Sequence, residues 1–178
     1  MKPPLADRIA AVRLLILDVD GVLTDGSILY SDAGEELKRF HVRDGSGLKL
    51  WQATGRITAV VSGRTSPAVD RRATELGIGI VLQKQSDKLA SLRQILRETS
   101  LLPSQCCAIG DDLQDIGLLQ AVGVAIAVAD ACAEVRAAAD TTTTLQGGRG
   151  AVRESIEWLL KLNGEWTTLV NAAMMPVG

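Results

Sequence analysis

The sequence predicts an α/β protein: a parallel sheet with helices on both of its faces. Short aliphatic and β-branched runs alternate with longer amphipathic stretches, which is the pattern of strand–helix–strand units. The chain has 178 residues, 47% hydrophobic and 22% charged, so we expect a single domain over residues 1–178. Polar residues follow several predicted strands, and in parallel sheets ligands bind at that edge.

The elements follow one another in a regular order. Apolar runs predict five strands, at residues 14–18, 57–62, 78–82, 106–109 and 124–127. Amphipathic periodicity predicts helices between and after them, at residues 47–53, 66–76, 87–98, 112–120, 132–138 and 151–162.

One segment interrupts this alternation after the first strand. Residues 27–30 and 36–42, joined by a turn at 31–34, are predicted to form a β-hairpin flap over about residues 26–43. Insertions beside a ligand site often serve as lids, so we expect a flap or a strand pair shared between subunits; an exposed hairpin without a role is the alternative. Residues 163–178 are predicted to be a C-terminal tail that frays at its end.

Charge and cysteine content restrict the partners. A net charge of −2 and 3% aromatic residues predict binding to neither nucleic acid nor an anionic membrane surface. No signal peptide or membrane-spanning stretch is evident, and three cysteines are expected as reduced thiols of a cytosolic protein. Because His41 is the only histidine, a zinc cluster or Ser-His-Asp triad is not expected.

The first strand ends in two carboxylates, Asp18 and Asp20, followed by Gly21 and Thr24. Side chains at i and i+2 share a face, so both acids would face one site if the strand geometry persisted. Two negative charges held close together destabilise the folded protein unless a cation or ligand offsets them. One carboxylate could attack phosphorus while the other transfers the leaving-group proton. We therefore interpret Asp18 and Asp20 as catalytic; a polar turn is the alternative.

Two later segments add candidate catalytic residues. Ser62 could donate a hydrogen bond to a phosphoryl oxygen, and Gly63 permits close approach of the backbone to a substrate. Lys88 begins a predicted helix, where the dipole disfavours a cation, so we interpret it as the charge that offsets nucleophile and phosphate. Lys84 competes for this role, and a solvated surface lysine is the alternative.

Acids after the fourth strand predict a metal site. Oxygen ligands from Asp18, the Asp20 carbonyl and Asp111 would suit Mg²⁺ that keeps several waters. We expect Asp112 and Asp115 to support these ligands without binding the metal, although an acidic helix N-terminus explains both equally well.

Arginines are the candidates for binding an anionic substrate. Arg149, in a glycine-rich loop, could hold a carboxylate or phosphate in a bidentate fork, and Arg43 and Arg64 are comparable candidates. His41, in the predicted second strand of the hairpin, is interpreted as a packing residue.

In combination these motifs resemble the haloacid dehalogenase-type phosphatases. The matching residues are the Asp18-Val-Asp20-Gly21-Val-Leu-Thr24 run, Ser62, Lys88 and Gly110-Asp111-Asp112. Residues 25–30, 40–45, 85–88 and 147–154 extend the similarity to the 3-deoxy-D-manno-octulosonate 8-phosphate phosphatase family, over about residues 10–162. Phosphatases of nonulosonate 9-phosphates and the C-terminal domain of some acylneuraminate cytidylyltransferases are similar in the same segments.

The resemblance implies a Mg²⁺-dependent hydrolase of a phosphorylated sugar acid, acting through an aspartyl-phosphate. It further implies a Rossmann-like core without a large cap and a cytoplasmic role in lipopolysaccharide sugar synthesis. Finally, it implies a homotetramer whose hairpins complete neighbouring active sites. A phosphotransferase or phosphomutase would need a cap to exclude water. A catalytically silent oligomerisation module would be free to lose Asp18, Asp20 or Lys88.

Overall fold

The computed structural model describes residues 2–174. Its helices are α1 (Leu5–Ala11), α2 (Val42–Ala53), α3 (Pro67–Leu76), α4 (Lys88–Thr99), α5 (Ile116–Ala121), α6 (Ala133–Ala138), α7 (Ala151–Leu162) and α8 (Trp166–Met174), with 3-10 turns η1 (Pro103–Gln105) and η2 (Leu113–Asp115). The strands are β1 (Leu14–Leu17), β2 (Leu29–Tyr30), β3 (Glu36–Leu37), β4 (Ile57–Val61), β5 (Ile80–Leu82), β6 (Cys106–Gly110), β7 (Val124–Ala127) and β8 (Thr141–Thr142).

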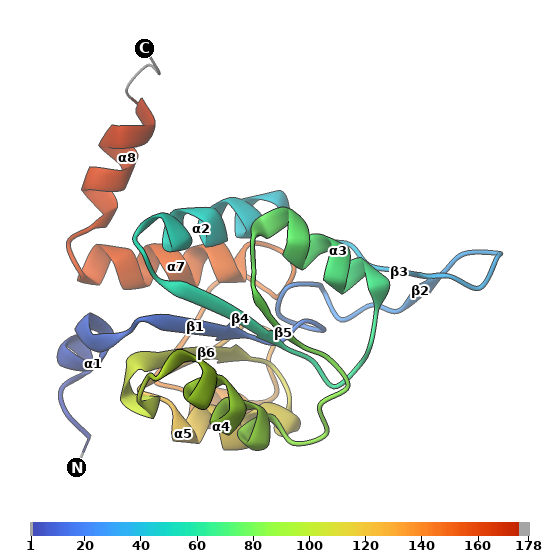
Figure 1. Cartoon of the computed structure of the whole chain (residues 1–178), viewed down its shortest axis with the longest axis horizontal. Helices are drawn as coiled ribbons and strands as arrows, with labels where there is room; N and C mark the ends of the chain where they lie inside the picture. The colour runs from blue at the N-terminus through green and yellow to red at the C-terminus, as the bar shows by residue number, and fades with distance from the viewer. Residues whose placement is uncertain (1, 175–178) are drawn as a thin grey trace.

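Six strands form one parallel sheet in the order β5-β4-β1-β6-β7-β8. In chain order this is the 3-2-1-4-5-6 arrangement of doubly wound folds, which places a crevice at the carboxyl ends of β1 and β6. Helices α2 and α7 cover one face, and α4 and α5 the other (Figure 1). The prediction of a parallel sheet with helices on both faces is confirmed.

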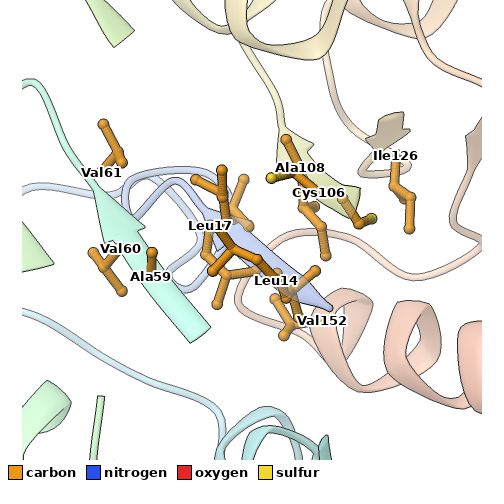
Figure 2. Close-up of a cluster of buried hydrophobic side chains, with 14 of the residues drawn as sticks. Leu14, Leu17, Ala59, Val60, Val61, Cys106, Ala108, Ile126 and Val152 are labelled. Atoms are coloured by element: carbon orange, nitrogen blue, oxygen red, sulfur yellow. The ribbon is translucent and has the colours of Figure 1, made fainter. Parts of the chain in front are cut away.

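The central strand β1 lies in the middle of the core. All four of its side chains, Leu14 to Leu17, are fully buried, because sheet neighbours flank it and helices cover both faces. Figure 2 shows Leu14 and Leu17 between Val60 of β4 and Ala108 of β6. This burial on both faces explains why the strand is a continuous apolar run.

The hairpin is shorter than predicted. Strands β2 and β3 pair antiparallel over two residues each, with Leu29 opposite Leu37, and project from the body of the molecule (Figure 1). The predicted second strand, residues 36–42, is wrong beyond Leu37, because α2 begins at Val42. Two glycines weaken the helical pattern at the start of α2, but both lie where the helix packs closely on a neighbour. A Cβ on Gly47 would lie 3.0 Å from Arg153 Cδ of α7, and a Cβ on Gly45 would lie 2.3 Å from Arg72 Nη2 of α3.

Three elements were not predicted: α1, β8 and α8. Part of the predicted tail is thus helical, while residues 175–178 lie outside the described residues. Arg56 holds the start of α8 through a bidentate ion pair with Glu165, at 2.6 Å for each contact. Among residues 2–174, each helix is too short or too polar to cross a bilayer.

Candidate active site

The chain turns sharply after β1 and separates the two acids of the first motif. The strand ends at Leu17, and the backbone N–H groups of Val22 and Thr24 both donate to the carbonyl of Val19. The strand geometry on which a shared strand face depended therefore ends before Asp18, and the turn instead sets the positions of the two acids. Asp18 is buried inside the crevice, whereas Asp20 is directed toward the base of the hairpin.

Lys88 occupies the space beside Asp18. Its side chain is 1% exposed, and Nζ lies 3.0 Å from Asp18 Oδ2 and 2.5 Å from Asp115 Oδ1. Burial alone would lower the pKa of Lys88, but the carboxylates of Asp18 and Asp115 outweigh it and raise the pKa. Its competitor Lys84 is exposed to solvent. The helix tolerates a lysine at its start because the Asp87 side chain caps the N–H groups of the first turn.

Asp115 contributes more than a favourable charge at a helix N-terminus. One oxygen of its carboxylate binds Lys88, and the other accepts the backbone N–H groups of Asp111 at 3.1 Å and Asp112 at 3.3 Å. Asp115 thereby fastens the loop after β6 to the lysine that contacts Asp18. Asp112 is exposed, and its side chain caps η2.

Asp111 completes what we call the aspartate cluster: Asp18, Asp111 and Asp115 around Lys88. Carboxylate oxygens of the three acids lie within 4.8 Å of one another. Burial raises the pKa of Asp18 to about 6, and burial followed by the charge of Asp18 raises the pKa of Asp111 to about 8. These raised values reflect first the removal of the two carboxylates from water and then the closeness of other carboxylates.

The aspartate cluster fits a divalent cation. Asp111 Oδ1 is buried and has no hydrogen-bond partner in the described part of the chain, whereas both oxygens of Asp115 have donors. Asp18 and Asp111 are therefore the acids with oxygen available, and carboxylate oxygen is the ligand type that Mg²⁺ prefers. Gly21, with φ of +88°, lets Asp111 approach, because a Cβ there would lie 2.0 Å from Asp111 Oδ2.

Charged residues at the base of the hairpin surround Asp20. Lys38, 2% exposed at its side chain, pairs with Asp20 and lies 3.2 Å from Glu36 Oε1. Arg64 lies 2.5 Å from Glu36 Oε2 and 3.8 Å from Asp20 Oδ2. The sequence reasoning missed Lys38 and Glu36, and no local pattern distinguishes them from ordinary charged residues of a hairpin.

Ser62 follows β4, the neighbour of β1. It is buried, and its Oγ accepts the backbone N–H of Arg64 at 3.2 Å, which leaves the hydroxyl proton free to donate. Space beside Gly63 is limited, since a Cβ there would lie 3.1 Å from Gln114 Oε1.

Arg43 and Arg149 lie elsewhere. Both line a cavity of about 590 Å³ between the starts of α2 and α7, which none of Asp18, Asp20 and Asp111 lines. His41 lines it too: it directly precedes α2, so its predicted position in a hairpin strand is wrong.

Fold and site together define a class of protein. Buried aspartates after β1 and β6 with a lysine between them, on a doubly wound sheet, are typical of haloacid dehalogenase-like hydrolases. The family model described as haloacid dehalogenase-like hydrolase matches residues 73–154.

Similar proteins identify a particular family within this class of hydrolases. The chain is 43% identical over 166 residues to the 3-deoxy-D-manno-octulosonate 8-phosphate phosphatase of Escherichia coli K12, covering 92% of this chain and 88% of the relative. The enzyme of that name from Salmonella typhimurium LT2 is 41% identical over 165 residues, covering 93% and 88%. The chain therefore belongs to the 3-deoxy-D-manno-octulosonate 8-phosphate phosphatase family.

Solved structures agree with this assignment. The phosphatase from Moraxella catarrhalis, solved with magnesium ion, phosphate ion and KDO, matches with a TM-score of 0.93 at 39% identity, over 96% of this chain and 98% of that one. A cobalt-bound phosphatase from Haemophilus influenzae matches with a TM-score of 0.89 at 36% identity, over 93% and 97%.

Proposed function

We propose that this chain hydrolyses 3-deoxy-D-manno-octulosonate 8-phosphate to the free sugar acid and inorganic phosphate, with Mg²⁺ as cofactor. The observation that carries the proposal is the aspartate cluster, in which Asp18 is buried against Lys88 beside the unpartnered oxygen of Asp111. Family relatives of this name, 41–43% identical over nine-tenths of the chain, support the substrate.

In the first step, Asp18 is the nucleophile. With a pKa of about 6 the carboxylate is ionised near neutral pH, and Lys88 holds it in place. A bond forms between a carboxylate oxygen and phosphorus as the phosphorus–sugar oxygen bond breaks. Asp20 gives its proton to the departing oxygen, so that the sugar leaves as an alcohol.

In the second step, water attacks the aspartyl-phosphate. Asp20 takes a proton from the water as the new bond to phosphorus forms, and the bond between phosphorus and Asp18 breaks. This releases phosphate and restores both acids. Lys38 keeps Asp20 in position, and Ser62 and Lys88 supply hydrogen bonds to the phosphoryl oxygens.

The metal would be held by Asp18, Asp111 and the carbonyl of Asp20. When bound, Mg²⁺ neutralises charge on the phosphoryl oxygens and on the acids themselves. We further propose that Arg64, at the base of the hairpin, contacts the carboxylate of the sugar acid, because it already binds the carboxylate of Glu36 at 2.5 Å.

Phosphate release from a panel of phosphosugars tests the proposal. We expect release from 3-deoxy-D-manno-octulosonate 8-phosphate with Mg²⁺ and none with a chelator; faster release from a nonulosonate 9-phosphate would contradict the substrate. Asp18→Asn should abolish turnover and leave the circular dichroism spectrum unchanged. Asp7→Asn, at an exposed acid of α1 outside the hairpin and the aspartate cluster, is the matched control. Substantial turnover by Asp18→Asn would overturn the role of the nucleophile.

We also propose a cytoplasmic homotetramer whose hairpins pair between subunits and complete neighbouring sites. The hairpin exposes four large apolar side chains: Ile28 at 49%, Leu29 at 48%, Tyr30 at 66% and Leu37 at 49%. Such a patch is typical of an interface, and three free cysteines agree with a reducing compartment. Light scattering should give the mass of four chains, and Leu29→Lys should reduce it. A monomeric wild type would contradict the assembly.

A further inference from the structure

The cavity between α2 and α7 carries chemistry that the proposed reaction does not use. Its volume of about 590 Å³ is within the range of small-molecule sites. Three arginines line it, and we name it the arginine cavity after them: Arg43, Arg149 and Arg153.

The arginines carry more positive charge than their partners neutralise. Arg149 donates to Asp25 Oδ2 at 3.0 Å, but the same carboxylate oxygen also binds Arg39, so one acid serves two guanidinium groups. Arg43 is exposed on the first turn of α2 and forms no ion pair or side-chain hydrogen bond within residues 2–174. The cavity wall therefore has a surplus of cationic donors.

The two glutamates that line the cavity form no ion pair with Arg43 or Arg149 within residues 2–174. The carboxylate of Glu154 accepts the backbone N–H groups of Thr144 and Leu145 and the hydroxyl of Thr144, at 2.8–3.0 Å. Glu157 binds the cationic side chains four residues before and after it, at 2.8 Å each. Both carboxylates thus have hydrogen-bond donors, and of the three arginines Arg153 is the one that pairs with either glutamate.

Unpaired buried atoms beside the cavity are a second, independent observation. Nδ1 of His41, a residue of the cavity wall, is buried and has no hydrogen-bond partner among residues 2–174. The same holds for Oδ2 of Asp44, 4.0 Å away. The other oxygen of Asp44 accepts the backbone N–H of Arg153 at 2.8 Å. Buried polar atoms normally have partners. His41 is therefore a polar residue of the cavity wall whose hydrogen-bonding capacity residues 2–174 leave partly unused.

We propose that the arginine cavity is a second anion site, separate from the aspartate cluster, that binds phosphate or a small phosphorylated metabolite. Guanidinium groups pair well with oxyanions that offer several acceptor oxygens. Contact with the catalytic loop is direct, because Arg149 holds Asp25 and the N–H of Gly148 donates to the carbonyl of Val22 at 2.9 Å. An occupant that competes for Arg149 would therefore act on the loop that carries Asp20.

Calorimetric titration with inorganic phosphate in Mg²⁺-free buffer of low ionic strength tests the site. Without a cation the aspartate cluster repels phosphate, so binding reports the arginine cavity. Arg43→Gln should weaken phosphate binding by about tenfold or more, as expected for loss of a charged hydrogen bond. The matched control is Arg71→Gln, at an exposed arginine of α3 whose one ion pair within residues 2–174 is with Glu75; this variant should bind phosphate as wild type does.

Tryptophan fluorescence supplies a second readout. Arg153 lies over the ring of Trp166, 5.2 Å from its centroid, so phosphate should change the emission of wild type and of Arg71→Gln but not of Trp166→Phe. Asp18→Asn should abolish turnover under the proposed function but should still bind phosphate in the arginine cavity. Turnover therefore tests the proposed function, and phosphate binding by this variant tests the arginine cavity separately.

The remaining outcomes overturn the inference. Absence of binding, or equal binding by Arg43→Gln and wild type, would show that the cavity holds no anion. Competition between phosphate and free 3-deoxy-D-manno-octulosonate at the Arg43-dependent site would make the cavity a substrate carboxylate subsite in place of a second site.

Discussion

Replacing Lys88 with methionine tests the electrostatics of the aspartate cluster. Lys88→Met keeps most of the side-chain volume but removes an ammonium group 3.0 Å from Asp18 and 2.5 Å from Asp115. Removing one partner of a buried ion pair costs about 3–5 kcal/mol, because the other charge stays buried and uncompensated. At about 2–4 °C per kcal/mol for a chain of this size, Tm should fall by about 6–20 °C.

Denaturation in Mg²⁺-free buffer at pH 8 and pH 5 measures this loss. The loss should be larger at pH 8, because burial raises the pKa of Asp18 to about 6 and a protonated acid no longer needs the ammonium. Mg²⁺ should restore part of the stability at pH 8 by binding the folded state. The control Lys161→Met removes an ammonium that is 54% exposed, with an expected change within about 0.5 kcal/mol. A loss below about 1 kcal/mol for Lys88→Met at pH 8 would refute the reasoning.

Two further substitutions probe Asp111. Gly21→Ala should lower turnover at least about tenfold, because its Cβ would lie 2.0 Å from Asp111 Oδ2; Gly34→Ala, with φ of +81° and open space, has the same backbone strain without the clash and should retain activity. The pKa of Asp111 is about 8 against 3.8 for the free side chain, so its contribution to stability without Mg²⁺ is present at low pH and lost as pH rises from about 4 to 8. Asp111→Asn should flatten the dependence of Tm on pH over that window, and a slope as steep as wild type would contradict this assignment.

Elements with a strong local signal were predicted well. β1 is a continuous apolar run because both of its faces are covered, and such a run ending in acids needs little tertiary information to be recognised. By contrast, α2 was predicted to begin late, since Gly45 and Gly47 weaken its helical pattern, although they allow the helix to pack on α3 and α7. Similarly, α8 depends on the ion pair between Arg56 and Glu165, residues far apart in the sequence.

The candidate site likewise combines features that the sequence predicted with features that it did not. Strand ends predicted which acids would gather at the edge of the sheet, and Asp18, Asp111 and Asp115 do lie together. Strand alternation, however, is not what positions Asp18 and Asp20: the strand ends at Leu17, and the turn after it gives Asp18 the partner Lys88 and Asp20 the partner Lys38. Lys38 was missed because its partner, Asp20, lies on another element.

By itself, the sequence determined the α/β class, the succession of the central strands along the chain and the acids that follow them, because apolar periodicity and turn residues act between near neighbours. Tertiary structure alone decided that Lys88 and not Lys84 contacts Asp18, that Asp115 holds Lys88, and that Arg43 and Arg149 line a different cavity. Those pairings depend on which residues, distant in the sequence, the fold brings together. The free energy of a buried charge is set by the charged and polar groups within a few ångströms of it.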